Sequence, residues 1–304
     1  MDTVIVTQNL IKQFGDLVAV NNLNLHINAG ESFALLGPDG AGKTTVMRLL
    51  CGAITPTAGD VKIGDFDLAK QTDKARELIG YMPQRFSLYE SLSVLQNIVF
   101  FSDLYGVDKS TRQERMGGLL EFSRLTPFVD RLAGQLSGGM KQKLALICTV
   151  IHEPPILLLD EPTTGVDPVS RRDFWKILHR LLAEGVTLLI STPYMDEAER
   201  CKRIGLIHAG KLLLVNTPAE LKRQMTGEVI EIKCAQPYMA NTYLKSHDIV
   251  ESVQAFSDKL RVLVKTSGSE QEIISFLESQ GVNVTDVRKV QPSLEDIFVS
   301  RLGK

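Results

Sequence analysis

The 304-residue sequence has no long hydrophobic run and no leader-like beginning. No stretch approaches the ~18 consecutive apolar residues that a membrane-spanning helix needs. The first ten residues, "MDTVIVTQNL", are too polar for a secretory signal and lack its positive start. We therefore expect a cytoplasmic chain that does not cross a membrane by itself.

The sequence also has few cysteines and little net charge. The four cysteines (Cys51, Cys148, Cys201 and Cys234) are far apart and form no C-x-x-C pair, which favours buried or incidental thiols over metal ligands or disulfides. The formal net charge of −2 gives no reason to expect a nucleic-acid partner. No internal repeat or low-complexity segment is present, so the chain is predicted to be globular, with one large or two smaller domains.

Short apolar runs alternate with helix-like segments in the first part of the chain. Residues 32–37 ("SFALLG"), 155–162 ("PILLLDEP") and 185–192 ("GVTLLIST") have the length and composition of buried strands. Residues 44–52 are predicted to form a helix that ends at a glycine. This order predicts an α/β fold with a parallel sheet covered by helices. It also predicts a mostly helical subdomain at about residues 90–150.

The pattern changes after residue 218. Four strand-like segments alternate with two helix-like ones in the order β-α-β-β-α-β, which predicts a small α+β ferredoxin-like domain. The strands are residues 228–234, 250–256, 259–265 and 282–290, and the helices are residues 236–247 and 269–281. A last helix follows Pro292, with Ser293 as its N-cap. The predicted domains are residues 1–218 and 219–304.

The loop after the first buried strand carries a phosphate-binding pattern. Residues 37–45, "GPDGAGKTT", fit G-x-x-x-x-G-K-[ST], in which glycines let backbone N–H groups and a helix N-terminus surround phosphates. Lys43 can reach the β- and γ-phosphates and Thr44 can bind Mg²⁺. A second buried strand ends in Asp160, which can also reach Mg²⁺, and Glu161 can polarise a water for attack on the γ-phosphate.

With these motifs, the chain resembles the nucleotide-binding subunits of ATP-binding cassette (ABC) transporters. "LSGGMKQKLAL", from Leu136, is similar to the signature motif of that family, although Met140 stands where glutamine is commoner. The end of the chain, "PSLEDIFVSRL", resembles subunits paired with ABC-2-type exporters. The resemblance implies a P-loop ATPase fold, ATP and Mg²⁺ as cofactors, and two cassettes that enclose two ATP molecules head to tail.

The resemblance implies a role for each matching residue. Glu161, Lys43 and Gln84 are catalytic, and Thr44, Gln84 and Asp160 hold the metal. Phe14 stacks on adenine, and Asp167 communicates across the dimer. The expected nucleotide-binding residues are Phe14, Gly37, Pro38, Asp39, Gly40, Ala41, Gly42, Lys43, Thr44, Thr45, Ser137, Gly138 and Gly139. Asp39 replaces the usual asparagine of the loop.

One position departs from the family. Pro193, in "STPYMDEAERC", stands where the family usually has a histidine that contacts the γ-phosphate. We expect Thr192 to cap a helix that has Pro193 in its first turn, with Asp196 and Glu197 near its positive end. Losing one preorganised donor costs roughly 10²–10³ in kcat, so this site is predicted to bind ATP and hydrolyse it slowly.

Several readings of function remain open. The first is the ATPase motor of an ABC-2-type exporter, held at the inner face of the membrane by permease subunits that dock after Gln84. It works either with a second, non-identical cassette that carries the histidine or as a homodimer in which Glu161 suffices. The alternatives are a non-hydrolysing, ATP-gated regulatory cassette and a cassette ATPase that acts on ribosomes or nucleic acid.

Overall fold

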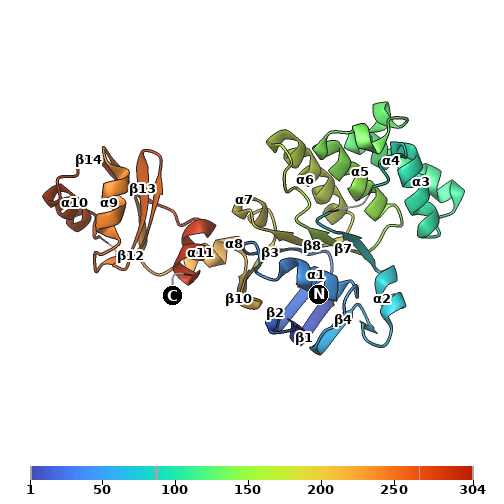
Figure 1. Ribbon diagram of the computed structural model, residues 1–304, viewed down its shortest axis with the longest axis horizontal. Coiled ribbons are helices and arrows are strands. Elements are labelled where there is room, and N and C mark those ends of the chain that lie inside the picture. The colour runs from blue at the N-terminus through green and yellow to red at the C-terminus, as the bar shows by residue number, and fades with distance from the viewer. Residues whose placement is uncertain (1, 86–87, 267, 303–304) are drawn as a thin grey trace. The chain divides into compact units, whose positions relative to one another are not determined.

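The computed structural model describes residues 2–85, 88–266 and 268–302. The chain divides into two compact units, Met1–Val215 and Asn216–Lys304, which are called the first and the second unit (Figure 1). Each has its own hydrophobic core. The two are therefore described separately.

The first unit is built on a six-stranded sheet with the order β10-β9-β3-β8-β7-β6. Its strands are β3 (Ser32–Leu36), β6 (Ile79–Met82), β7 (Ile156–Asp160), β8 (Thr187–Thr192), β9 (Arg203–His208) and β10 (Lys211–Asn216). The pairs β3–β8, β3–β9, β6–β7 and β7–β8 are parallel, and β3, β7 and β8 are buried throughout. The buried parallel strands predicted from the apolar runs are thus confirmed.

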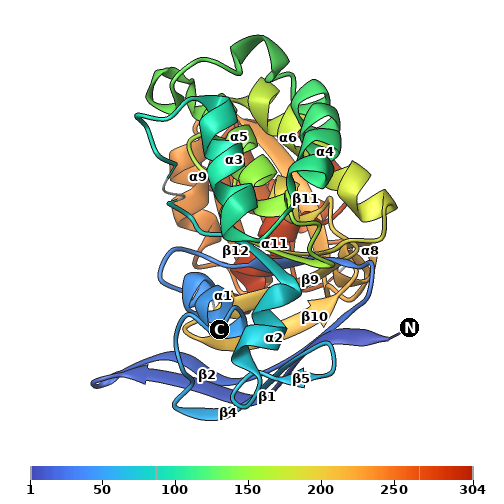
Figure 2. The ribbon, with the colours of Figure 1, turned by 90° about the vertical axis from the view of Figure 1, so that its right-hand side faces the viewer.

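A second, antiparallel sheet in this unit was not predicted from the sequence. It has the order β2-β1-β4-β5 and consists of β1 (Thr3–Phe14), β2 (Leu17–Asn28), β4 (Ala58–Ile63) and β5 (Phe66–Asp67). Helix α1 (Lys43–Leu50) contacts strands of both sheets, and Met47 and Leu49 on this helix are fully buried (Figures 1 and 2). The glycine loop before α1 is therefore held on a rigid support.

The remaining helices of the first unit include the predicted helical segment. They are α2 (Thr72–Glu77), α3 (Val94–Leu104), α4 (Lys109–Ser123), α5 (Gly138–Val150), α6 (Pro168–Ala183) and α7 (Met195–Ala198), with short 3-10 turns at Thr126–Phe128 and Ala133–Gln135. Helices α3 to α6 lie on the side of the six-stranded sheet opposite to β1, β2 and β4 (Figure 2). Ser93 and Gln96 form a capping box that fixes the start of α3.

The second unit has the predicted ferredoxin-like order. Its elements are α8 (Pro218–Arg223), β11 (Glu228–Cys234), α9 (Pro237–Leu244), β12 (Val250–Phe256), β13 (Lys259–Val264), α10 (Glu270–Ser279), β14 (Val284–Val290) and α11 (Leu294–Leu302). The strands form an antiparallel sheet with the order β12-β13-β11-β14. The Ser293 hydroxyl accepts a hydrogen bond from the Asp296 N–H at 3.2 Å, which confirms Ser293 as the N-cap of α11.

All four cysteines are buried and free. Burial raises the pKa of the Cys148 thiol, and burial together with the charge of Glu197 raises that of Cys201 to about 12. Among the helices of the described residues, none is long and apolar enough to cross a membrane.

Candidate functional site

The loop between β3 and α1 depends on its glycines. Gly40 and Gly42 have φ of 77° and 102°, in the left-handed region that strains other residues. A Cβ at Gly37 would lie 2.3 Å from the carbonyl oxygen of Ile207, and one at Gly42 would lie 2.4 Å from that of Ala19. The loop leads into α1, whose first N–H groups have no partner within the helix. This arrangement is typical of a phosphate-binding loop.

Lys43, the first residue of α1, directs its ammonium group into this loop. The side chain is almost fully buried, and its Nζ donates to the carbonyl oxygens of Gly37 at 2.9 Å and Pro38 at 3.0 Å. The same Nζ lies 3.0 Å from Oε1 of Glu161. A buried charge needs such partners, and the pair places a cation and a carboxylate beside the glycine loop.

Glu161 follows β7 and is held from several sides. Its backbone N–H donates to the carbonyl oxygen of Ser191 at 3.1 Å and to Oγ of the same residue at 3.0 Å. Its Oε2 accepts from Gln84 Nε2 at 2.9 Å and from Thr164 Oγ1 at 3.4 Å. Its φ is 48°, a strained value for a residue that is not glycine. Strain of this kind is concentrated at functional sites, where the surrounding structure enforces it.

Asp160, the last residue of β7, offers a cation ligand. It is fully buried, and burial raises its pKa while hydrogen bonds from Ser191 and Thr44 act in the opposite direction. Ser191 Oγ donates to Oδ1, whereas Oδ2 is buried without a hydrogen-bond partner. A buried, unpartnered carboxylate oxygen near a threonine hydroxyl suits a hard cation. Asp160 and Thr44 therefore fit Mg²⁺.

The turn at Pro193 differs from the prediction. Helix α7 begins at Met195 with Tyr194 as N-cap, so Pro193 precedes the helix and Thr192 does not cap it. Thr192 ends β8 instead, and its hydroxyl accepts from the Tyr194 N–H at 3.0 Å, which forms a turn before the helix. The expectation of Pro193 in the first helical turn was wrong. The hydrogen bond from the Tyr194 N–H to the Thr192 hydroxyl holds residues 192–194 in a turn, and the helix begins only after it.

Glu197 is a buried junction that the sequence did not reveal. It was expected only as an acid near the start of a helix, yet it is 1% exposed. Its carboxylate accepts from Thr163 Oγ1 and from Thr192 Oγ1, the latter at 2.8 Å, and lies 3.5 Å from Arg171 Nε. It therefore joins the segment after Glu161 to the segment before Pro193. The polar residues at the end of an otherwise apolar strand ("LLIST") were the available signal.

The predicted signature residues lie at the start of α5. Ser137 is its N-cap and accepts from the Met140 N–H at 3.3 Å. A Cβ at Gly139 would lie 2.4 Å from Ser170 Oγ, so a glycine is needed where α5 and α6 approach each other. Among the described residues, no hydrogen bond or ion pair joins Ser137, Gly138 or Gly139 to Lys43 or Glu161. Within the described part of one copy, the signature residues are thus not bonded to Lys43 or Glu161.

Three further residues were predicted from the family resemblance, namely Phe14, Asp39 and Asp167. Phe14 ends β1 and is 48% exposed, with Lys12 Nζ 4.9 Å from the centre of its ring. Asp39 is exposed in the glycine loop. Asp167 is the N-cap of α6, and the N–H groups of Val169 and Ser170 donate to its carboxylate at 3.0 and 2.9 Å.

Comparisons with known proteins agree with this geometry. The family model described as "ABC transporter" matches residues 20–164, and "ATP-binding protein DrrA1-3-like, C-terminal domain" matches residues 217–301. The "Nod factor export ATP-binding protein I" of Rhizobium sp. (strain N33) is 35% identical over 96% of this chain and 95% of its own length. The chain belongs to the ABC transporter family of ATP-binding proteins. The ABC ATPase class predicted from the sequence motifs is thereby confirmed.

The chain also resembles a longer relative and a solved structure. It is 40% identical to the "Probable multidrug ABC transporter ATP-binding protein YbhF" of Escherichia coli (strain K12), over 99% of this chain but 52% of that protein, so it spans about half of that relative. The dimeric "post-hydrolysis state of the ATP-binding cassette MJ0796 bound to ADP and Pi" has a TM-score of 0.64 and 27% identity, covering 70% of this chain and 98% of that one. This likeness confirms the P-loop ATPase fold.

Proposed function

We propose that this chain is the ATP-hydrolysing motor subunit of an ABC-2-type exporter. The observation that carries the proposal is the cluster of Lys43, Glu161 and Gln84 beside the glycine loop, with a free oxygen of Asp160 next to it. The exporter relatives support the direction of transport, because the Rhizobium protein is named for export. ATP closes two cassettes against each other, and hydrolysis with product release opens them.

In this mechanism each side chain has a defined task. Mg²⁺ bound with ATP supplies charge compensation for the phosphates, and Thr44 and Asp160 would hold it. Lys43 exchanges its contact with Glu161 for the phosphate oxygens. Glu161, once released, accepts the proton of the attacking water, and Gln84 orients both the water and that carboxylate. The glycine loop and Ser137-Gly138-Gly139 of the opposing cassette supply N–H groups to the γ-phosphate.

Pro193 is the feature that lowers the rate of ATP hydrolysis at this site in our proposal. The Gly37 N–H donates to the carbonyl oxygen of Thr192 at 3.4 Å, so residue 193 follows directly on a residue bonded to the phosphate loop. A proline there has neither a side-chain donor nor an N–H. The missing donor lowers kcat by roughly 10²–10³. We therefore propose that the chain works beside a second, non-identical cassette that carries a histidine at this position and uses this chain's signature residues.

The permease would dock on the segment after Gln84. Tyr89 and Phe100 are 46% and 38% exposed and lie edge to face with ring centres 4.6 Å apart. On α3 the buried side chains include Val94 and Ile98, so the segment supplies both core and an aromatic surface. The predicted docking segment also includes residues 86–87, which lie outside the described residues. A permease that binds here would hold the cassette at the inner face of the membrane.

Steady-state ATPase measurements on the purified chain test the proposal. Pro193→His should raise turnover by roughly 10²-fold, and adding Glu161→Gln should abolish the gain. Pro193→Ala is the matched control, because it removes the proline and restores the backbone N–H without adding a side-chain donor, and it should leave turnover low. A brisk native enzyme that Pro193→His leaves unchanged would refute the impaired site and favour a homodimer. Purification of the intact transporter with a single kind of cassette would refute the non-identical partner.

A non-hydrolysing regulatory cassette is the second candidate, and Pro193 is the observation that favours it. It predicts ATP binding without turnover even when a histidine-bearing partner is present. The intact contacts of Glu161 with Lys43 and Gln84 favour the motor instead.

A further inference from the structure

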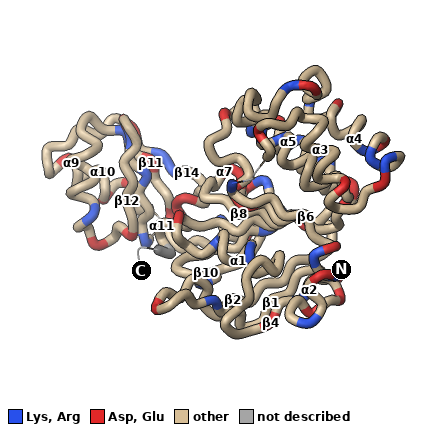
Figure 3. The backbone as a smooth tube through the Cα atoms, turned by 45° about the vertical axis from the view of Figure 1, so that its right-hand side comes forward, with Lys and Arg blue, Asp and Glu red and all other residues tan. Residues whose placement is uncertain are grey.

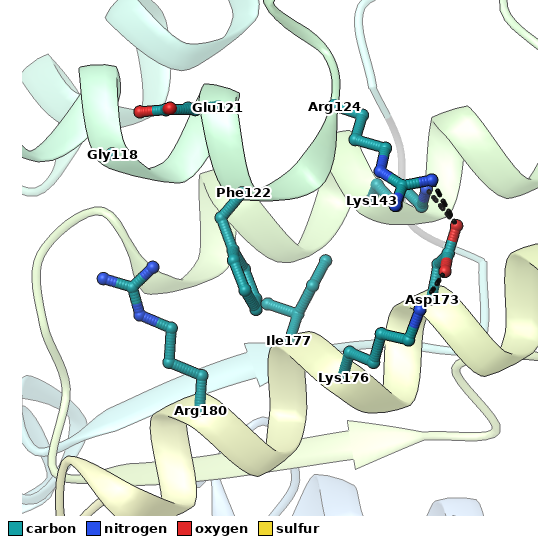
Figure 4. A pocket seen from close by; sticks show the side chains of 9 residues that line it. All are labelled: Gly118, Glu121, Phe122, Arg124, Lys143, Asp173, Lys176, Ile177 and Arg180. Atoms are coloured by element: carbon teal, nitrogen blue, oxygen red, sulfur yellow. Dashed lines mark hydrogen bonds and ion pairs between the residues drawn. The ribbon is translucent and has the colours of Figure 1, made fainter.

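A pocket of about 500 Å³ lies between α4, α5 and α6 of the first unit, and its lining includes none of the residues predicted to bind ATP (Figure 4). We call it the α4–α6 pocket. The residues that line it are Gly118, Glu121, Phe122, Arg124, Lys143, Asp173, Lys176, Ile177 and Arg180. Its volume is in the range of small-molecule sites.

The pocket holds a surplus of positive charge around one carboxylate. Asp173 lies 3.0 Å from Lys176 and 3.7 Å from both Arg124 and Lys143. The three cations point toward it in Figure 4. When every charged lining residue is counted, four cations (Arg124, Lys143, Lys176 and Arg180) face two carboxylates (Glu121 and Asp173), which leaves a local excess of +2. Figure 3 shows acidic and basic residues distributed over both units, so this excess is local. A dianion would balance it.

Lys143 has the least exposed side chain of the four cations that line the pocket. It is 9% exposed, and its only ion pair among the described residues is the contact of 3.7 Å with Asp173, which is too long for a hydrogen bond. Its Nζ is not one of the fully buried atoms without a partner, so the ammonium group is open to the pocket and can reach a ligand. An anion within reach of Lys143 would supply the acceptors that Asp173 does not.

Two neighbouring glycines in α4 leave the pocket open. Gly117 and Gly118 lie in the interior of the helix, where each destabilises it by about 1 kcal/mol relative to alanine. A Cβ at either position would meet no atom within 4 Å, so internal packing does not require them. At Gly118, which lines the pocket, the missing side chain keeps space free for a ligand.

The other side of the pocket is apolar. The Phe122 ring lies near Ile177, and the Arg180 guanidinium lies 4.8 Å from the ring centre (Figure 4). Gly118, Phe122, Ile177 and Arg180 also line a neighbouring pocket of about 780 Å³, which includes Leu119 and Leu181. A ligand with an anionic end and an apolar or aromatic body would fit the two together.

We propose that the α4–α6 pocket binds a small phosphate monoester whose dianion contacts Lys143, Lys176 and Arg124 and whose apolar or aromatic group rests against Phe122 and Ile177. A phosphate monoester carries a charge near −2 at neutral pH, which matches the excess. Guanidinium and ammonium groups are suited to its oxygens. The ligand bridges α4 and α6 and stabilises their contact. This proposal does not depend on transport or on hydrolysis at the ATP site.

Isothermal titration of the full chain with phenyl phosphate tests it, with saturating MgADP present to occupy the glycine loop. We expect one site per chain, and weaker binding of inorganic phosphate, which lacks the ring, and of benzoate, which lacks the second charge. Lys176→Gln should weaken the affinity about tenfold, as expected for one lost charge-assisted hydrogen bond. Lys141→Gln is the control, because this half-buried lysine of α5 pairs with Glu90 outside the pocket.

A steric pair of variants makes the test independent of charge. Gly118→Leu fills the pocket and should abolish binding, whereas Gly117→Leu makes the same change one residue away and should leave it intact. Both sites offer open space for a Cβ, so both variants should fold. No binding of phenyl phosphate at millimolar concentration, equal effects of the two glycine variants, or equal binding of benzoate would each overturn the proposal.

Discussion

Replacing Glu197 should destabilise the first unit more than any surface change on the same helix. Glu197→Ala leaves the hydroxyls of Thr163 and Thr192 without their acceptor and the buried Arg171 Nε without its carboxylate. Breaking a buried pair of this kind costs about 3–5 kcal/mol, so we expect a loss of about 4 kcal/mol. Glu197→Gln keeps one acceptor and loses the charge, and should cost about 2 kcal/mol.

Urea unfolding followed by tryptophan fluorescence measures this loss. Trp175 is the single tryptophan of the chain and is buried in α6, so the signal reports on the first unit alone. With a slope of about 3 kcal/mol per M, the loss for Glu197→Ala corresponds to a midpoint lower by about 1.3 M urea.

Asp196→Asn is the matched control for this experiment. Asp196 neighbours Glu197 on α7 and also faces Arg171, at 3.8 Å, but its side chain is 61% exposed. An exposed pair contributes about 0–1 kcal/mol, so the midpoint should hardly move. If Glu197→Gln and Asp196→Asn shifted the midpoint equally, the buried junction would not have the energetic role that its contacts imply.

Three further predictions concern other parts of the chain. Phe14→Ala should weaken ATP binding about tenfold in a fluorescent-nucleotide titration while Phe14→Tyr keeps it, because ring stacking on a base is worth about 1–3 kcal/mol; equal affinities would rule out stacking. Ser137→Ala removes the N-cap of α5 and should lower the free energy of unfolding by about 1 kcal/mol, measured by tryptophan fluorescence. An unchanged free energy of unfolding would mean that Ser137 does not cap the helix. Hydrogen bonds from Lys259, and then from Arg288, hold the pKa of Glu231 below 4.5, its ordinary value. Its stabilisation is therefore complete above pH 4.5 and is lost as the pH falls through the lowered pKa, so the hydrogen-exchange protection factors of β11, which are corrected for the slower intrinsic exchange in acid, should fall in the native chain and less in Glu231→Gln; identical acid profiles would contradict this.

The local parts of the fold could be predicted because each has a strong sequence signal. Apolar runs of strand length gave β3, β7 and β8, and alternation gave the sheet of the second unit. The antiparallel sheet escaped prediction because β1 and β2 mix polar and apolar residues over twelve positions each, with several register shifts between them. Their pairing depends on contacts between strands, which a single sequence does not display.

In the candidate site, too, the local motifs could be predicted and the contacts between distant segments could not. The motifs marked Lys43 and Glu161, and the structure brings their side chains within 3.0 Å of each other. The role of Glu197 depends on partners from β8, α6 and the loop after β7, which are far apart in sequence. The helix start at Met195 depends on the Thr192 hydroxyl, a single hydrogen bond that competes with the expected cap.

The burial of the four native thiols has a practical consequence for following motion in this protein. Cys51, Cys148, Cys201 and Cys234 are each no more than 8% exposed, and burial raises the pKa of every one of them. Only thiolates react quickly with maleimides and spin labels, so these side chains should remain unmodified at neutral pH. A cysteine introduced at an exposed position of each unit could then be labelled selectively in the otherwise native chain, and the distance between two such labels would report directly how the units move during the ATP cycle.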